Sequence, residues 1–454
     1  MTNAILRGKP DAGNPHVRFD EGEVASAKPR RGSLLYKKSF LSHLSVSAAS
    51  VSLLGAVARA APDVTVTSVT QTPTRSVLVS YDLAGEDAVV TLDVQTNTLA
   101  DASGDWVSIG PENVRYASGD VNRKVAAGTG KTIRWSARRS WPDQDIPTPT
   151  VRAVVKAWPL DDPPDYMVVD LLGSKNVRYY EDVRQLPAKN GIDDDLYRTS
   201  ELVMRRVHAT NVEWYMGSPA SELGRDATNW DAPETRHAAT LTKDYYLGVF
   251  ELTGRQYANV GGGKAVADDE DTLPLMGVSW NSMRGNCLWP DVLHEVTAGG
   301  LKLFREKTGI STWDLPTEAQ WEFACRAGST GALYTGEELE AEDVSARLDA
   351  LAWYKANAGD VRHRVGEKQP NVWGFYDMLG NVSEFCLDWF ALDLGIVSVT
   401  DPIGPTEGTC RAVRGGRFSL DAKKCRSAAR ENWVKPDDAK NYFGFRLVCD
   451  CRAE

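Results

Sequence analysis

The chain has 454 residues, of which 42% are hydrophobic and 25% charged, the balance of a soluble globular protein. This length predicts two or three domains with a buried core. The formal net charge of −10 argues against a nucleic-acid partner, because phosphate binding relies on an excess of Lys and Arg.

Residues 1–60 are typical of a signal peptide and leader. A basic region around Arg30-Arg31 precedes a mostly apolar run at 40–57, and Ala58-Arg59-Ala60 has the small-x-small form of a cleavage site. We therefore expect a periplasmic or extracellular mature chain, from about Ala61, with no stable membrane insertion after cleavage. A membrane anchor is the alternative for the apolar run, and the arginine pair leaves a twin-arginine route open.

Residues 61–160 alternate apolar and polar residues in short runs separated by Gly, Asp, Asn and Pro, which predicts a β-sandwich. The expected strands cover 77–81, 88–94, 131–137 and 151–157. The architecture is similar to an immunoglobulin or fibronectin type III module, and the absence of Cys and His favours a spacer or docking role over catalysis. Residues 161–200 are expected to be a linker with a connecting strand near 167–171.

Residues 201–454 contain several motifs in a fixed order. They are WYMGS at 214–218, LPTEAQWEFACRAG at 315–328, NVWGFYDMLGNVSEF at 371–385, RGG at 414–416, CRSAAR at 425–430 and GFR at 444–446. This series resembles the formylglycine-generating-enzyme, or sulfatase-modifying-factor, family. The resemblance implies an α+β domain similar to C-type lectins, with little regular secondary structure. The residues themselves predict a short helix at 318–326 with Thr317 as its N-cap.

Active enzymes of that family oxidise a substrate cysteine with copper(I) held by two thiolates, which are ligands that copper(I) prefers. Leu420 stands at the first thiolate position, and Arg417 replaces a serine. Cys425 matches the second thiolate position when residues are counted forward from the glycine pair. It does not match when they are counted backward from the motif at 427–430. Copper is therefore not expected, and Cys425 is a weak catalytic candidate.

Cys425 has a second interpretation. In an oxidising compartment the seven cysteines are disulfide candidates, and their odd number leaves at least one unpaired within the chain. A disulfide or a packed contact between Cys325 and Cys425 would tie the predicted helix to the closing segment.

The resemblance also implies a structural calcium ion held by Asp377, Gly380, Val382 and Glu384. Oxygen donors from a tight loop suit this hard cation. A weaker second site would include Asn357 and Ala358. The alternatives for Asp377 and Glu384 are capping of backbone amides in a turn, or a general acid and base pair.

Three functions remain open. The favoured one is a non-catalytic binding or structural module, which would recognise a protein or glycan through a face between Gly416 and Tyr442. A formylglycine-generating enzyme or a related metal-dependent enzyme is the alternative, and a retroelement-diversified ligand-binding protein is the third. The candidate ligand-face residues are Arg417, Asp421, Lys424, Asn432 and Trp433.

Overall fold

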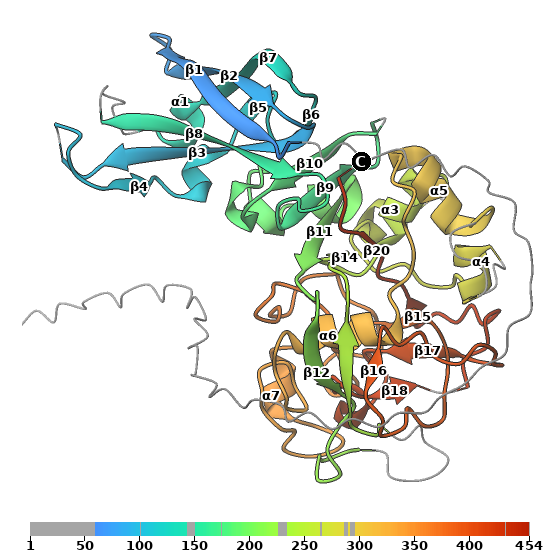
Figure 1. Cartoon of the computed structure of the whole chain (residues 1–454). Helices are drawn as coiled ribbons and strands as arrows, with labels where there is room; N and C mark the ends of the chain where they lie inside the picture. Colours follow the sequence, from blue (N-terminus) through green and yellow to red (C-terminus); the bar gives the residue numbers. More distant parts are fainter. Residues whose placement is uncertain are drawn as a thin grey trace, which may run out of the picture. The chain divides into compact units, whose positions relative to one another are not determined.

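The computed structural model describes residues 60–453, apart from 100, 143–149, 174, 226–233, 264–265, 286–288, 291–295 and 432 (Figure 1). The predicted signal peptide, except Ala60, lies outside the described residues, as do Cys287 and Asn432. Residues 58–454 belong to one compact unit. Within the described part, no helix has the length and apolar character needed to cross a membrane.

The N-terminal region consists of β-strands in two sheets. One sheet has the order β1 (Asp63–Gln71), β2 (Ser76–Ala84), β7 (Gly128–Ser136) and β5 (Ala117–Gly119). The other joins β4 (Trp106–Ser108), β3 (Ala88–Asn97) and β6 (Arg123–Val125), and β8 (Val151–Pro159) also pairs with β3. The four predicted strands are confirmed as β2, β3, β7 and β8.

Strands of the two sheets share one hydrophobic core. Every second residue of β2 is buried, which places Val77, Val79, Tyr81 and Leu83 on one face. They cluster with buried residues of β3 and with Ile133 and Trp135 of β7. A 3-10 turn, η1 (Pro111–Val114), and the short helix α1 (Ala137–Ser140) complete this region.

A five-stranded antiparallel sheet follows, with the order β10 (Val177–Tyr180), β9 (Tyr166–Asp170), β11 (Glu201–Val207), β14 (Tyr245–Gly248) and β20 (Val448–Asp450). The connecting strand predicted at 167–171 is confirmed as β9. Between β10 and β11 lie η2 (Val183–Gln185), η3 (Gly191–Asp193) and α2 (Leu196–Thr199). The segment expected to be a linker therefore also supplies two strands to this sheet.

Two smaller sheets complete the C-terminal region, which is mixed α and β as expected. One has the order β12 (Val212–Met216), β13 (His237–Leu241) and β16 (Val399–Thr400). The other has the order β18 (Arg430–Glu431), β17 (Arg411–Arg414), β15 (Ser383–Trp389) and β19 (Phe443–Gly444). Short helices and 3-10 turns connect the strands: α3 (Gly254–Asn259), η4 (Asp268–Glu270), α4 (Trp280–Arg284), α5 (Gly299–Thr308), α6 (Glu318–Arg326), α7 (Ala346–Asp349) and η5 (Ala422–Lys424).

The helix predicted at 318–326 is confirmed as α6, with the same bounds. Thr317 Oγ1 accepts a hydrogen bond from Gln320 N, and the Gln320 side chain accepts one from Thr317 N. This reciprocal cap satisfies two amides that the first helical turn leaves without partners.

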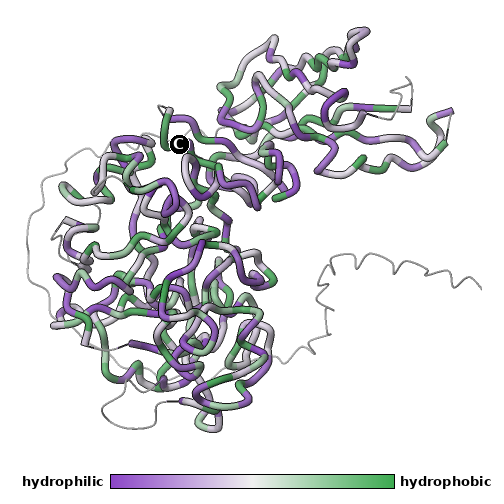
Figure 2. The backbone as a smooth tube through the Cα atoms, turned by 180° about the vertical axis from the view of Figure 1, so that it is seen from behind, coloured by the Kyte–Doolittle hydropathy of each residue, from purple (hydrophilic) through white to green (hydrophobic). Residues whose placement is uncertain are grey.

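Large aromatic side chains stabilise the interior, where regular elements are short. Trp280, Trp313 and Trp321 are fully buried. Figure 2 shows hydrophobic and hydrophilic residues alternating in short stretches along the backbone. Burying side chains of this size contributes much of the hydrophobic free energy of such a core.

Candidate functional site

A pocket lies beside the glycine pair that ends β17. It has a volume of about 200 Å³ and is lined by Val413, Gly416, Leu420, Lys424, Ala429, Arg430 and Glu431. We call it the Gly416 pocket. Gly416 has a φ of 72°, and a Cβ atom there would lie 2.5 Å from the Lys424 carbonyl oxygen and 2.6 Å from Cys425 Sγ. Any larger residue would push the neighbouring turn away.

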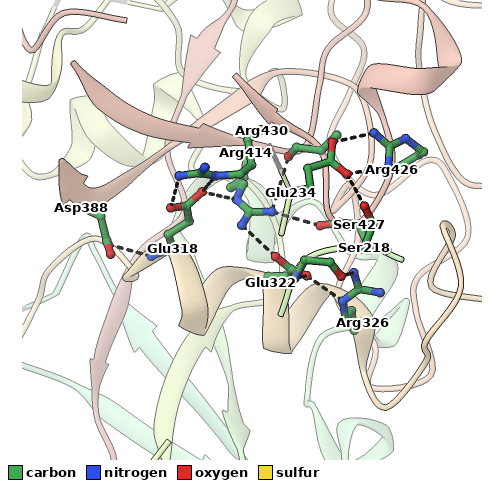
Figure 3. Close-up of polar contacts among 12 residues, drawn as sticks. Ser218, Glu234, Glu318, Glu322, Arg326, Asp388, Arg414, Arg426, Ser427 and Arg430 are labelled. Carbon is green, nitrogen blue, oxygen red and sulfur yellow. Dashed lines mark hydrogen bonds and ion pairs between the residues drawn. The ribbon is translucent and has the colours of Figure 1, made fainter. Parts of the chain in front are cut away.

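Behind the pocket lies a buried network of ion pairs, drawn in Figure 3. From β17, Arg414 Nε donates to Glu318 Oε1 at 2.8 Å and Arg414 Nη2 to Glu322 Oε2 at 2.8 Å. Arg430 Nε of β18 donates to the same Glu318 oxygen at 2.6 Å. Burial alone would raise the pKa of Glu318, but the Arg430 and Arg414 guanidinium groups lower it to about 2. One face of α6 is thereby fixed to two strands.

The network continues along α6 and into the loop after β12. Arg326 Nε donates to Glu322 Oε1 at 2.8 Å. Arg426 pairs with Glu222 and donates to Glu234 Oε1 at 2.6 Å. Since these groups are almost fully buried and bond to one another, we assign them to the framework of the pocket.

Polar residues at the rim of the pocket are also paired with one another. Arg417 forms an ion pair with Glu431, and its guanidinium carbon lies 4.1 Å from the centre of the Tyr442 ring. Ser383 Oγ donates to Glu431 Oε2 at 2.9 Å. The rim is therefore preorganised.

The residues predicted as a ligand face are only partly brought together. Lys424 lines the pocket, and Arg417 bonds to Glu431, which also lines it. Asp421 instead pairs with Lys355 Nζ at 2.9 Å. Trp433, two residues after Glu431, is 70% exposed, and Asn432 lies outside the described residues.

The predicted disulfide between Cys325 and Cys425 is absent, because both residues are free, buried thiols. Cys325 Sγ lies 3.8 Å from the Met378 carbonyl oxygen, whereas Cys425 Sγ packs against Gly416. Both residues nevertheless belong to the same hydrophobic cluster. Burial raises the pKa of each to about 12, so both are neutral at physiological pH. None of the six cysteines within the described part forms a disulfide.

Neither thiolate position of the active enzymes provides a metal ligand at the pocket. Leu420 lines the wall, and Cys425 is not among the lining residues. A leucine side chain and a buried, protonated thiol do not fit copper(I), which needs soft anionic sulfur ligands.

The predicted calcium loop lies at the start of β15. Asp377 is buried with a φ of 55°, and its Oδ2 accepts from Gly366 N at 2.6 Å. Glu384 accepts from Trp321 Nε1 at 2.7 Å and from Arg446 Nη2 at 2.7 Å. Gly380 has a φ of 81°, and a Cβ atom there would lie 2.3 Å from the Trp353 carbonyl oxygen. The tight turn thus requires glycine.

A third buried carboxylate, Glu251, adjoins this loop. Val382 N donates to Glu251 Oε1 at 3.1 Å, and Asn381 Nδ2 donates to Oε2 at 2.6 Å. Burial, Asp377 and Glu384 raise the pKa of Glu251 well above its usual range. Three buried carboxyl groups therefore adjoin this loop, and one of them, Glu384, is already paired with Arg446.

The calcium site itself stays a prediction. In the described part of the chain, no cluster of three or more His, Cys, Asp and Glu side chains is placed to hold a metal. The predicted site needs only two carboxylates and two carbonyl oxygens. At the weaker site, Asn357 Oδ1 accepts from Tyr354 N at 2.9 Å, and His363 Nε2 lies 2.9 Å from the Ala358 carbonyl oxygen. These internal contacts compete with a metal.

Reasoning from the sequence missed Glu251 and the pairing of Arg446 with Glu384. Arg446 stands in the GFR motif at 444–446, but nothing in that motif indicates that it meets Glu384. It also missed the network of Glu318, Glu322, Arg414, Arg426 and Arg430. The glutamates at i and i+4 on one helix face were its only local signal.

Comparisons with known proteins agree with these motifs. Residues 207–451 match the family model described as "Sulfatase-modifying factor enzyme 1-like domain". The chain is 30% identical over 202 residues to the formylglycine-generating enzyme of Mus musculus, covering 41% of this chain and 53% of that enzyme. It is 33% identical over 210 residues to the serine/threonine-protein kinase pkn1 of Chlamydia pneumoniae, covering 45% of this chain and 28% of that kinase.

Among solved structures, Treponema denticola variable protein 1 is 24% identical, with a TM-score of 0.44. The alignment covers 55% of this chain and 95% of that one. At these values the likeness adds nothing to the family assignment. The chain spans about half the length of the mouse enzyme, so that enzyme's activity does not transfer by similarity. Since the family model matches residues 207–451, more than half of the 454 residues, this protein belongs to the sulfatase-modifying factor enzyme 1-like family.

Proposed function

We propose that this protein is an exported, non-catalytic binding module whose Gly416 pocket takes an apolar side chain of a protein ligand. The observation that carries the proposal is Leu420 in the pocket wall, at the position where active relatives are expected to have a thiolate. We further propose that copper is not a cofactor, that calcium stabilises the loop at 377–384, and that the mature protein is periplasmic or extracellular.

The composition of the pocket supports a protein ligand. Val413, Leu420 and Ala429 are apolar lining residues beside the charged Lys424 and Glu431. Its volume of about 200 Å³ is below the roughly 300–1,000 Å³ of most small-molecule sites. Exposed Trp433 is the kind of large aromatic side chain that anchors protein interfaces.

The proposal also includes a specific fold for each of the two regions. We infer that residues 201–454 have a C-type-lectin-like arrangement, in which the segment from Gly416 to Tyr442 forms the binding face. We also infer that the N-terminal sheets form an immunoglobulin-like sandwich that acts as a spacer or docking unit.

An enzymatic assay separates this proposal from formylglycine synthesis. Protein loaded with copper(I) is incubated with a Cys-x-Pro-x-Arg peptide, and the aldehyde is measured by mass spectrometry. We expect no conversion, because one neutral, buried thiol cannot hold copper(I) for catalysis. Conversion that the Cys425→Ser variant abolishes would overturn the proposal.

Peptide display tests the binding face directly. Random peptides selected on the wild-type chain should bind at least about tenfold more weakly to Leu420→Lys and to Trp433→Ala, the loss expected for a buried anchor. The matched control is Ile396→Ala, which changes an 80% exposed apolar residue outside the proposed face. Selected peptides that bind both face variants as tightly as wild type would contradict the proposal.

A further inference from the structure

A second, larger pocket lies away from the Gly416 pocket and shares none of its lining residues. It has a volume of about 380 Å³, within the roughly 300–1,000 Å³ typical of small-molecule sites. We call it the Tyr257 pocket. Its lining residues are Gly254, Tyr257, Gly262, Gly263, Val266, Glu270, Leu273, Leu275, Met276, Gly277, Val278, Arg362 and Asn441.

The Tyr257 ring packs closely against two glycines, which have no side chain to collide with it. A Cβ atom at Gly262 would lie 2.4 Å from the ring, and one at Gly300 would lie 2.7 Å from it. Tyr257 is only 8% exposed, yet its hydroxyl makes no hydrogen bond within the described part of the chain. Burial raises the pKa of Tyr257, so the hydroxyl stays protonated and can both donate and accept. A tyrosine at a pocket wall whose hydroxyl bonds to no described residue can form a hydrogen bond with a ligand.

The other polar groups make the pocket electrically neutral. Arg362 Nη2 lies 3.3 Å from Glu270 Oε1, and Arg362 Nη1 donates to the Pro274 carbonyl oxygen at 3.0 Å. The Asn441 carboxamide, like the Tyr257 hydroxyl, has no hydrogen-bond partner among the described residues. Its amide and carbonyl offer two donors and an acceptor.

Apolar side chains cover another part of the wall. Leu273, Leu275 and Val278 line the pocket together with the polar groups. Hydrogen bonds hold this segment in place, because Leu275 N donates to the Leu252 carbonyl oxygen at 2.7 Å and Gly254 N donates to the Leu273 carbonyl oxygen at 3.2 Å. The pocket is therefore built on ordered backbone.

We propose that the Tyr257 pocket binds a neutral saccharide unit. A sugar ring has hydroxyls that donate and accept, which match Tyr257 and Asn441, and C–H faces that match the leucines. An ionic ligand would gain little, because Arg362 and Glu270 already neutralise each other. A purely apolar ligand would leave the tyrosine hydroxyl and the asparagine amide unpaired, at a cost in free energy. The proposal is independent of peptide binding at the Gly416 pocket.

Saturation-transfer NMR on the full mature chain tests this inference, with glucose, galactose, mannose and N-acetylglucosamine as probes. We expect at least one to bind. Tyr257→Phe and Asn441→Ala should each weaken that binding about fivefold, the effect of one lost hydrogen bond. The matched control, Tyr215→Phe, removes the hydroxyl of a 53% exposed tyrosine on β12 and should bind like wild type.

Tyr257→Phe keeps the ring that packs against Gly262 and Gly300, so its melting temperature should stay close to that of wild type. The inference is overturned if none of the four sugars binds the wild-type chain. It is also overturned if a bound sugar binds both folded pocket variants as tightly as wild type. Peptide binding at the Gly416 pocket is measured separately on Tyr257→Phe, which lies outside the proposed binding face, and should not change.

Discussion

At the scale of single residues, we expect Asp388 to make the free energy of unfolding depend on pH. This carboxyl group is buried and accepts from Glu318 N at 2.8 Å, and burial together with the charge of Glu318 raises its pKa to about 7. A raised carboxyl pKa gives stability that is present at low pH and is lost as pH rises through the folded-state pKa. Stability from this group should therefore fall between about pH 4 and pH 7.

The Asp388→Asn variant checks this prediction. It keeps an oxygen that can accept from Glu318 N but cannot ionise. Between pH 5 and pH 8, wild type should lose at least about 1 kcal/mol of unfolding free energy more than the variant. The measurement is urea unfolding at both pH values. Parallel pH dependence of wild type and variant would show that Asp388 ionises normally.

The sequence could not predict the direction in which individual side chains point. Two cysteines in an oxidising compartment suggest a disulfide, but spacing along the chain says nothing about where each thiol points. Cys325 faces the Met378 carbonyl and Cys425 faces Gly416. Backbone geometry from outside both motifs decides this, so no local signal could have corrected the prediction.

At the scale of elements, α6 depends on its pairing with β17. Arg414 Nη2 bonds to Glu322 and Arg414 Nε to Glu318, and both pairs are almost fully buried. Replacing Arg414 by Leu would leave Glu318 with Arg430 alone and Glu322 with Arg326 alone, and breaking buried ion pairs in this way costs about 3–5 kcal/mol. Lys355→Ala is the control, because it removes an exposed pair with Asp421 and should cost less than about 1 kcal/mol. Urea unfolding of the two variants should differ by several kcal/mol, and equal losses would refute the prediction.

Elements with local signals were predictable. The N-cap threonine and the apolar spacing predicted α6 with its observed bounds. Alternation predicted β2, β3, β7 and β8, and a strand-like run at 167–171 predicted β9. The ion-pair network could not be predicted, because Glu318 and Arg414 are almost one hundred residues apart in the sequence. Which charges meet depends on sheet order, and periodicity carries no information about that.

At the scale of the whole molecule, calcium should raise the melting temperature of the unit that contains residues 58–454. The loop at 377–384 holds buried Asp377 and Glu384 beside Glu251, so a bound cation would remove repulsion that the empty loop retains. At 100 times its dissociation constant, calcium would add about 2.7 kcal/mol if it binds only the folded state.

Thermal melts in EDTA and in excess calcium measure this effect. Asp377→Asn keeps an oxygen for Gly366 N but removes one charge, so its response to calcium should be smaller than that of wild type. An unchanged wild-type midpoint would leave the carboxylates as caps of a turn. An equal response in the variant would place the cation elsewhere.

The position of β20 at one edge of the five-stranded sheet affects how the protein folds during synthesis. β20 pairs with β14, and Arg446, just before it, donates to Glu384 of β15 and to the carbonyl oxygen of Gly248. These partners are synthesised well before residue 446. A growing chain therefore carries Glu384 and an unpaired edge of β14 until almost all of the domain has been translated. The pairing of β20 with β14 and of Arg446 with Glu384 forms late and joins residues far apart in the sequence. The nascent chain should therefore need protection from aggregation during synthesis.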